Sequence, residues 1–318
     1  MSNADKDGTF TSSGSQGGTE MMLAGLKKYA DPKLLDQFNI ICSRVRYIDT
    51  DRKNILWLHD LWQDPEVSHL RDARSLGKFT KLVFVSHYQQ ATYNIGLGVP
   101  YSAGIVMQNA IDSFPQHTKP DATDGRVNLI YHTTPHRGLE LLIPSFIELT
   151  KYFPNIHLDV YSSFKAYGWE ERDKPYQELF DICREHPQIS YHGFQPNSVV
   201  RTALEKAHIF AYPSIWTETS CIAMIEAMSA GCDVVCPSSG ALPETAANFA
   251  LMYPFTENVD VHVNNFANVL INAIETYTNP AFVNRRSVQR LYFDRIYNWK
   301  YRANQWNNLF TYLLNGGA

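Results

Sequence analysis

The chain lacks long apolar runs, basic blocks and a leader-like start. No apolar run among its 318 residues reaches the roughly 18–20 residues that a membrane-spanning helix needs. The first residues do not show the charged-then-apolar pattern of a signal peptide. The 28 basic and 32 acidic side chains give a net charge of −4 without a basic cluster. A membrane span, a secretory leader and a nucleic-acid partner are therefore not predicted.

Cysteine is scarce, and its pattern fits neither a disulfide framework nor a metal site. The five cysteines are odd in number and scattered along the chain, which is typical of a reducing compartment and predicts a cytoplasmic protein. No histidine or second cysteine pair lies at zinc spacing from Cys232 and Cys236, so we expect no metal site. No Gly-x-Gly-x-x-Gly motif follows a first strand, and no dinucleotide cofactor is predicted.

What the chain does have is globular composition, with 44% hydrophobic and 19% charged residues, and a length typical of two domains. Short apolar runs alternate with helical patterns, which predicts parallel α/β sheets. The expected strands are Phe38–Cys42, Asn54–Leu58, Lys81–Val85, Gly104–Met107, Val127–Tyr131, Ile156–Tyr161, Ile189–Tyr191, His208–Tyr212 and Asp233–Cys236. The expected helices are Thr19–Ala30, Arg137–Tyr152, Pro175–Glu185, Ser198–Ala207 and Ser220–Ala230, with a terminal helical segment over Val288–Leu314.

A polar stretch with two prolines, Ser113–Gly125, interrupts this rhythm and is predicted to be a linker. The predicted organisation is an N-terminal domain, the linker, a second α/β domain and a C-terminal helix, with the bounds 1–112, 113–125, 126–287 and 288–318. The aromatic stripe of the last segment is expected to be packing surface.

The window Phe210–Glu244 is the most informative part of the sequence. It places Glu218 in a loop after a buried strand, and a helix is expected to begin near Ser220–Ile222. The free amides of a first helical turn form an anion site at the carboxyl end of a parallel strand. Glu226, about one turn further on, could accept two hydrogen bonds from a ribose diol. The alternative is that Glu218 is a solvated cap and Glu226 an exposed helix residue.

The neighbours of Glu226 argue against that alternative. Ala223, Ala227 and Met228 predict a largely covered helix, and a buried carboxylate needs a partner.

The two glutamates and the following Glu226-Ala227-Met228-Ser229-Ala230-Gly231 resemble the donor-binding signature of the retaining GT-B glycosyltransferases of family 4, the glycosyl transferases group 1. Further stretches resemble motifs of that family in the same order, and the resemblance runs from about residue 17 to 314. They are Gly17-Gly18-Thr19-Glu20, Asn109-Ala110-Ile111-Asp112, Tyr191-His192-Gly193-Phe194, His208–Ser214 and Trp299–Leu313.

The resemblance implies an α/β fold of GT-B architecture: two Rossmann-like domains and a C-terminal helix that crosses back onto the first domain. The first domain is expected to be abbreviated, because residues 1–16 contain no buried strand. The implied reaction moves a hexose or pentose from a nucleotide-diphosphate sugar to an acceptor hydroxyl with retention, without a metal. The acceptor is a carbohydrate, a lipid or a protein glycan, and peripheral membrane contact is compatible with the family.

The resemblance also assigns roles to residues. Glu226 would hold the ribose, and Glu218 would contact hydroxyls of the transferred sugar. Arg137, followed by Gly138, matches a cation that neutralises charge on the leaving diphosphate. His59, at the end of a predicted strand, would face the sugar, the alternative being an ordinary polar strand end. The remaining donor-binding residues are Gly18 of the Gly-Gly-x-Glu loop and the amides of Ser220, Cys221 and Ile222.

The sequence departs from the family pattern at His132, which stands where a second cation is usual. We expect it also to bind the donor, with activity that weakens as pH rises through the pKa of His132 in the complex. Two alternatives remain open: a sugar-nucleotide epimerase or hydrolase of the same fold, and a non-catalytic subunit that binds a nucleotide-sugar.

Overall fold

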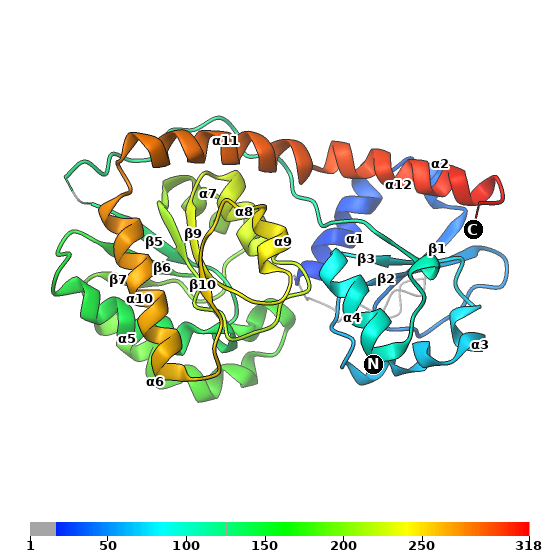
Figure 1. Ribbon diagram of the computed structural model, residues 1–318, viewed down its shortest axis with the longest axis horizontal. Coiled ribbons are helices and arrows are strands. Elements are labelled where there is room, and N and C mark those ends of the chain that lie inside the picture. The colour runs from blue at the N-terminus through cyan, green and yellow to red at the C-terminus, as the bar shows by residue number, and fades with distance from the viewer. Residues whose placement is uncertain (1–16, 125, 318) are drawn as a thin grey trace. The chain divides into compact units, whose positions relative to one another are not determined.

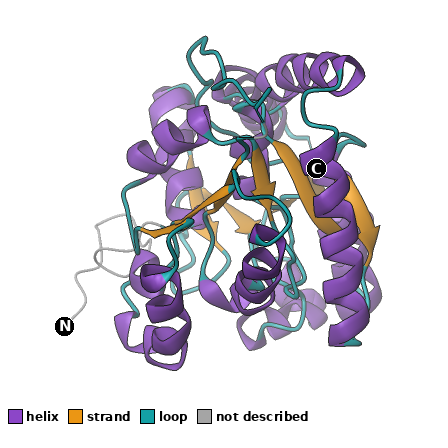
Figure 2. Ribbon diagram, turned by 90° about the vertical axis from the view of Figure 1, so that its left-hand side faces the viewer, coloured by secondary structure: helices purple, strands orange, loops and turns teal. Residues whose placement is uncertain are grey.

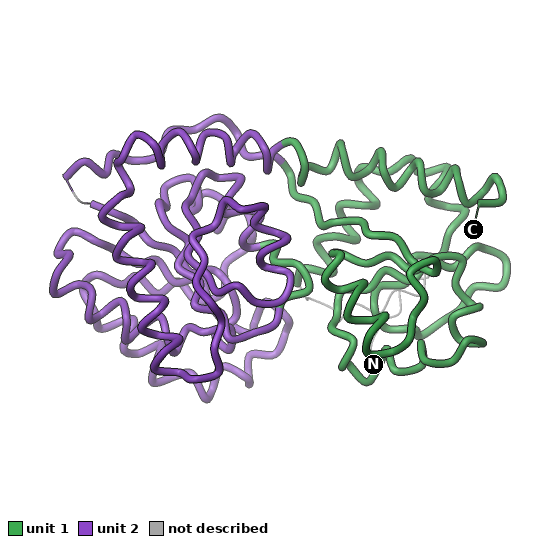
Figure 3. Tube along the Cα trace, viewed as in Figure 1, with its two compact units in different colours: residues 1–112, 218–222, 295–318 green, residues 113–217, 223–294 purple. Residues whose placement is uncertain are grey.

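The computed structural model describes residues 17–124 and 126–317. They form two compact units, each assembled from separate stretches of chain (Figure 3). Of the described residues, unit 1 takes 17–112, 218–222 and 295–317, and unit 2 takes 113–124, 126–217 and 223–294. The expectation that residues 1–16 contain no strand lies outside the described residues. The domain bounds given above stay a prediction.

Unit 1 contains a four-stranded parallel sheet in the order β1-β2-β3-β4. The strands are β1 (Phe38–Cys42), β2 (Lys53–Leu58), β3 (Lys81–Phe84) and β4 (Gly104–Val106). The helices with it are α1 (Gly18–Tyr29), α2 (Pro32–Leu35), α3 (Ala73–Leu76), α4 (His87–Leu97), α12 (Trp299–Leu314) and the 3₁₀ turns η1 (Pro65–Arg71) and η2 (Tyr101–Ala103).

Alternate residues of these strands supply two separate cores, because successive side chains of a strand point to opposite faces. Ile55 and Trp57 of β2 face the cluster formed with α1 and α12. Leu56 and Leu58 of the same strand face the cluster formed with η1 and α4. The sheet of unit 1 is therefore covered on both sides, as near-continuous apolar strands predict.

The terminal segment Val288–Leu314, predicted as one helical stretch, is two helices, so that expectation was wrong. Helix α11 (Pro280–Ile296) ends before Tyr297, and α12 follows. Asn298 is extended, and its side chain accepts a hydrogen bond from the Tyr301 N–H, which caps α12. Trp306 of α12 packs edge-on against Trp57 with ring centroids 4.9 Å apart. The aromatic stripe of α12 is thus packing surface, as predicted.

Unit 2 contains a six-stranded parallel sheet in the order β10-β9-β8-β5-β6-β7. Its strands are β5 (Asn128–Tyr131), β6 (His157–Val160), β7 (Ile189–Tyr191), β8 (Ile209–Ala211), β9 (Asp233–Ser238) and β10 (Leu251–Pro254). Strand β10 was not predicted: it is a short edge strand with only one buried residue, Tyr253.

The strand order decides which helices cover which face, because crossovers between parallel strands are right-handed. Helices α5 (Leu139–Thr150) and α6 (Gln177–Glu185) cover one face together with α10 (Val259–Glu275), which contacts α5 (Figure 1). The opposite face takes α7 (Asn197–Lys206), α8 (Ile222–Ser229) and α9 (Leu242–Ala246). Figure 2 shows helices on both sides of the strands. The 3₁₀ turns of unit 2 are η3 (Pro135–Arg137), η4 (Phe164–Tyr167) and η5 (Glu170–Tyr176).

His208, just before β8, joins three parts of unit 2 as a neutral ring. Its Nδ1 accepts a hydrogen bond from the Asn128 N–H at 2.8 Å, so Nε2 carries the hydrogen and donates to the Pro120 carbonyl at 3.1 Å. Burial lowers the pKa of His208 to about 4. A proton on Nδ1 would break the bond to Asn128.

We therefore expect His208 to make the fold sensitive to acid. Above about pH 6.5 the ring is neutral in both states. Below it the unfolded chain binds a proton that the folded chain refuses, so stability falls as pH drops toward about 4. The full difference corresponds to roughly 3 kcal/mol. Urea unfolding of wild type and His208→Asn at pH 7.5 and 4.5 measures it. The variant should lose less stability than wild type, whereas equal losses would contradict the assignment.

Candidate functional site

Polar residues follow the strands of unit 2 at one edge of the sheet. His132, Thr133 and Thr134 come after β5, Ser162 after β6 and Ser214 after β8. The carboxyl ends of parallel strands lie at the same edge, where open α/β sheets bind ligands.

Several side chains at this edge, including His136 in the turn η3 after β5, bury a polar atom that makes no hydrogen bond within the described chain. The atoms are His132 Nε2, Thr133 Oγ1, Thr134 Oγ1, His136 Nδ1 and Ser162 Oγ. A buried polar group without a partner costs about 1–3 kcal/mol. Several such unpartnered atoms at one sheet edge are typical of a binding site for a polar ligand.

The turn between β5 and α5 carries Arg137. Gly138 follows with φ of +108°, and a Cβ added there would lie 2.2 Å from the Pro213 carbonyl oxygen. Only glycine allows this approach, which brings the turn against the end of β8. The Arg137 guanidinium lies 5.8 Å from the centre of the Trp216 ring.

Helix α5 begins directly after this turn, and no side chain caps its first amides. Uncapped amides at a helix start, preceded by an arginine, form a suitable site for an anion. The turn therefore combines a cation with backbone donors at the polar edge of the sheet.

His132 and His136 are neutral donors or acceptors here rather than cations. Burial lowers the pKa of His132 to about 3 and that of His136 to about 4, and Arg137 and Arg172 add to the lowering at His136. The pH dependence expected for His132 stays a prediction. It requires a bound diphosphate that raises this pKa from about 3 to about 7 or higher.

Glu226 lies inside α8 and is only 3% exposed, so its interpretation as an exposed helix residue is wrong. The predicted need for partners is confirmed. Asn197 Nδ2 donates to both carboxylate oxygens at 3.0 and 3.1 Å, and Arg201 Nη1 lies 3.2 Å from Oε1. Burial raises the pKa of Glu226, while Arg201 and Asn197 act in the opposite direction. The sequence reasoning missed both partners, although their spacing of four residues on α7 places them on one helix face.

The other predicted donor residues belong to unit 1. Helix α8 begins at Ile222, two residues later than predicted, so Ser220 and Cys221 precede it. Residues 218–222 pack with unit 1, and Glu218 is buried. Thr219 Oγ1 donates to the His59 carbonyl at 2.8 Å. A Cβ on Gly18 would lie 3.0 Å from Ile222.

His59 follows β2, as predicted. Its N–H donates to Ser43 Oγ at 2.9 Å, and its ring lies beside Trp57. Burial lowers its pKa to about 3, and Nε2 has no hydrogen-bond partner in the described residues. The structure thus brings His59, Gly18 and residues 218–222 together in unit 1. It places His132, Arg137 and Glu226 in unit 2.

Two other features of the described residues bear on the site. No group of three or more His, Cys, Asp or Glu side chains within 17–124 and 126–317 could hold a metal ion. No helix in that part of the chain is long and apolar enough to cross a membrane.

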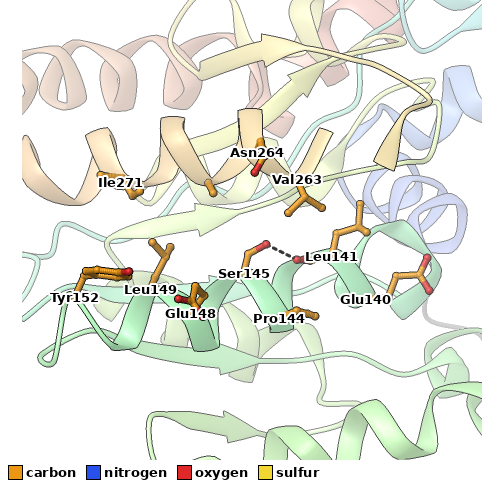
Figure 4. Close-up of a pocket in the computed structure, with 11 residues that line it drawn as sticks. Glu140, Leu141, Pro144, Ser145, Glu148, Leu149, Tyr152, Val263, Asn264 and Ile271 are labelled. Atoms are coloured by element: carbon orange, nitrogen blue, oxygen red, sulfur yellow. Dashed lines mark hydrogen bonds between the residues drawn. The ribbon is translucent and has the colours of Figure 1, made fainter. Parts of the chain in front are cut away.

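A groove of about 450 Å³ runs between α5 and α10 (Figure 4). None of the predicted site residues lines it. Its apolar lining comes from Leu141, Pro144, Leu149, Val263, Ala267 and Ile271.

The chain resembles known proteins in fold more than in sequence. The glycosyltransferase of Rickettsia africae ESF-5 has a TM-score of 0.69 at 11% identity, covering 87% of this chain and 77% of that one. HepE of Anabaena, solved with UDP and glucose, has a TM-score of 0.70 at 15% identity, covering 95% of this chain and 98% of that one. These similarities, with the two parallel sheets, confirm the predicted α/β fold of GT-B type.

One curated protein is similar in sequence. It is a subunit of the phosphatidylinositol N-acetylglucosaminyltransferase of Arabidopsis thaliana, and it is 26% identical over 173 residues, which are 54% of this chain and 37% of that protein. This chain thus matches little more than a third of the relative's length.

The family model described as glycosyl transferases group 1 matches residues 113–280, more than half of the chain. The matched range includes Arg137, Arg201 and Glu226. The chain therefore belongs to the glycosyl transferases group 1 family.

Proposed function

We propose that this protein transfers a sugar from a UDP-sugar to an acceptor hydroxyl with retention at the anomeric carbon, as in glycosyltransferase family 4. The observation that carries the proposal is the buried carboxylate of Glu226, which lies in the same unit as a polar sheet edge with unpartnered polar atoms. Support for the UDP part comes from structural neighbours solved with UDP, among them HepE of Anabaena. The name of the Arabidopsis relative makes UDP-N-acetylglucosamine the first donor to test.

In this proposal each group of unit 2 has a defined task. Glu226 accepts hydrogen bonds from the ribose diol, and the first amides of α5 face the diphosphate. Arg137 stabilises the negative charge that grows as the bond between the anomeric carbon and the phosphate oxygen breaks. The acceptor oxygen then bonds to that carbon on the same face, and its proton passes to the leaving phosphate.

The roles of Glu218, His59, Gly18 and the amides of residues 220–222 follow from the family resemblance and stay predictions. So does the independence from a metal cofactor. We infer a cytoplasmic location from the five cysteines, which are odd in number and scattered along the chain. The acceptor is a carbohydrate, a lipid or a protein glycan, with peripheral membrane contact as one way to reach it.

Thermal unfolding in the presence of UDP, GDP, ADP, CMP and NAD tests the donor site. UDP at about 100 times its dissociation constant is expected to stabilise the protein by roughly 2.7 kcal/mol. The other nucleotides should stabilise it less at the same concentration. A protein that no nucleotide stabilises would contradict the proposal.

Product analysis with UDP-N-acetylglucosamine then separates the candidate reactions. A transferase releases UDP only when an acceptor is present, whereas a hydrolase releases it without one. An epimerase leaves the nucleotide attached to the sugar. Binding of UDP without any turnover across a panel of glycan and lipid acceptors would favour a non-catalytic subunit instead.

A further inference from the structure

A single arginine of α7 joins the buried carboxylate of unit 2 to the start of the predicted linker. Arg201 Nη1 lies 3.2 Å from Glu226 Oε1. Its Nη2 donates to the Ser113 carbonyl, also at 3.2 Å. The centre of the guanidinium lies 3.7 Å from the centre of the Phe114 ring, which is close enough for a cation–π contact.

These contacts use properties that only arginine combines. The guanidinium is planar, always charged and presents several N–H donors in a fixed fork. One edge can therefore bind a carboxylate while another binds a carbonyl, with the flat face on an aromatic ring. The Glu226 side chain is 4% exposed and that of Arg201 18%, so water screens their interaction weakly.

Among the described residues, Arg201 is the charged group that lowers the pKa of Glu226. Asn197 is the uncharged hydrogen-bond partner of the same carboxylate. Burial alone raises the pKa of this carboxyl, and the cation opposes that rise. Without the cation, Glu226 would hold a proton at higher pH. It would then lack the negative charge, and one of its two acceptor oxygens would become a donor.

We propose that Arg201 is a positioning residue that keeps Glu226 ionised and oriented for the ribose of the donor, and that Ser113 and Phe114 hold Arg201 in place. The inference rests on the proposed function, because it concerns the residue assigned to the ribose. It extends the donor site to the first two residues of the predicted linker, which no motif of the sequence had indicated.

The first test measures the dissociation constant of UDP between pH 5.5 and 8 for wild type, Arg201→Gln and Arg201→Lys. We expect little pH dependence in wild type. Arg201→Gln should bind about tenfold more weakly at pH 6 and recover toward higher pH, because loss of the nearby cation raises the pKa of Glu226 further. Arg201→Lys keeps the charge but not the fork, so it should show little pH dependence, like wild type, with an affinity between those of wild type and Arg201→Gln. A role confined to packing would not give this pH profile.

The second test is a double-mutant cycle between Arg201 and Phe114. Phe114→Leu removes the aromatic face and is expected to weaken UDP binding about threefold to tenfold. In the Arg201→Gln background it should have no further effect, because the ring would act only through the guanidinium. If Arg201→Gln fails to fold, Phe114→Leu is compared with Arg201→Lys instead. Phe114→Leu should then weaken UDP binding by part of the amount expected for Arg201→Gln.

Arg184→Gln is the matched control, because Arg184 is 47% exposed and pairs with Asp181 on the surface of α6. It should bind UDP like wild type. If Glu226→Ala binds UDP more weakly but Arg201→Gln keeps the wild-type dissociation constant for UDP at every pH, only the inference about Arg201 is overturned. Additive effects of Phe114→Leu and Arg201→Gln would overturn the role of the linker. If Glu226→Ala binds UDP normally, the proposed function itself fails.

Discussion

Glu226→Ala is expected to remove at least half of the stabilisation that UDP is expected to give wild type. The carboxylate is the group assigned to the ribose diol, and hydrogen bonds to a charged group contribute about 1.5–3 kcal/mol. Their loss corresponds to roughly 10- to 100-fold weaker binding. Thermal unfolding with and without UDP, followed by calorimetric titration, measures the effect.

The same change should also destabilise the unliganded protein, because it leaves Arg201 without the carboxylate it contacts. Breaking a buried ion pair costs about 3–5 kcal/mol. Glu226→Gln keeps the shape and an acceptor for Arg201, so it should remain better folded yet bind UDP weakly. Glu178→Ala, at an exposed position in the first turn of α6, is the control and should leave both properties unchanged. Normal UDP binding by Glu226→Gln and Glu226→Ala would remove the basis of the donor site.

Gly138→Ala is expected to lower the free energy of unfolding by about 4 kcal/mol. Two costs combine at this position: a side chain at φ of +108° is strained, and its Cβ would lie 2.2 Å from the Pro213 carbonyl oxygen. The clash is with backbone, so no side-chain rotation relieves it. Either the turn that carries Arg137 or the end of β8 must move.

The control is Gly168→Ala, where φ is +72° but an added Cβ would meet nothing within 4 Å. This variant carries the conformational cost alone, about 1–2 kcal/mol. Urea unfolding should therefore separate the two glycines by about 2 kcal/mol or more. Equal stability losses would show that the approach of Gly138 to Pro213 is not a constraint. Where Gly138→Ala folds, its UDP stabilisation should also be weaker, because Arg137 is displaced.

Sequence patterns located most strands because buried parallel strands are short, apolar and separated by helices. Strands β1 and β7 were predicted with their observed bounds, Phe38–Cys42 and Ile189–Tyr191. Strand β10 was missed because an edge strand buries little and gives no continuous apolar run. Helices α11 and α12 were merged because the aromatic pattern continues across the cap at Asn298.

The candidate site was predictable only where a local motif existed. Glu226 was identified from such a motif, but its partners Asn197 and Arg201 lie 29 and 25 residues away in the chain. No periodicity connects positions so far apart, and the contact arises from the packing of α7 beside α8. The placement of residues 218–222 in unit 1 had no sequence signal for the same reason.

Unit 1 is assembled from stretches near both ends of the chain, and this has a consequence for its folding during synthesis. Its core needs Trp306, Phe310 and Leu313 of α12 against strands made from the first part of the chain. A ribosome adds residues one at a time, and small domains usually fold soon after they emerge. Here the face of the N-terminal sheet that packs against α1 and α12 stays only partly covered until about two hundred further residues have been synthesised. A nascent chain stalled before Trp299 should therefore expose the part of that face that α12 covers in the folded unit.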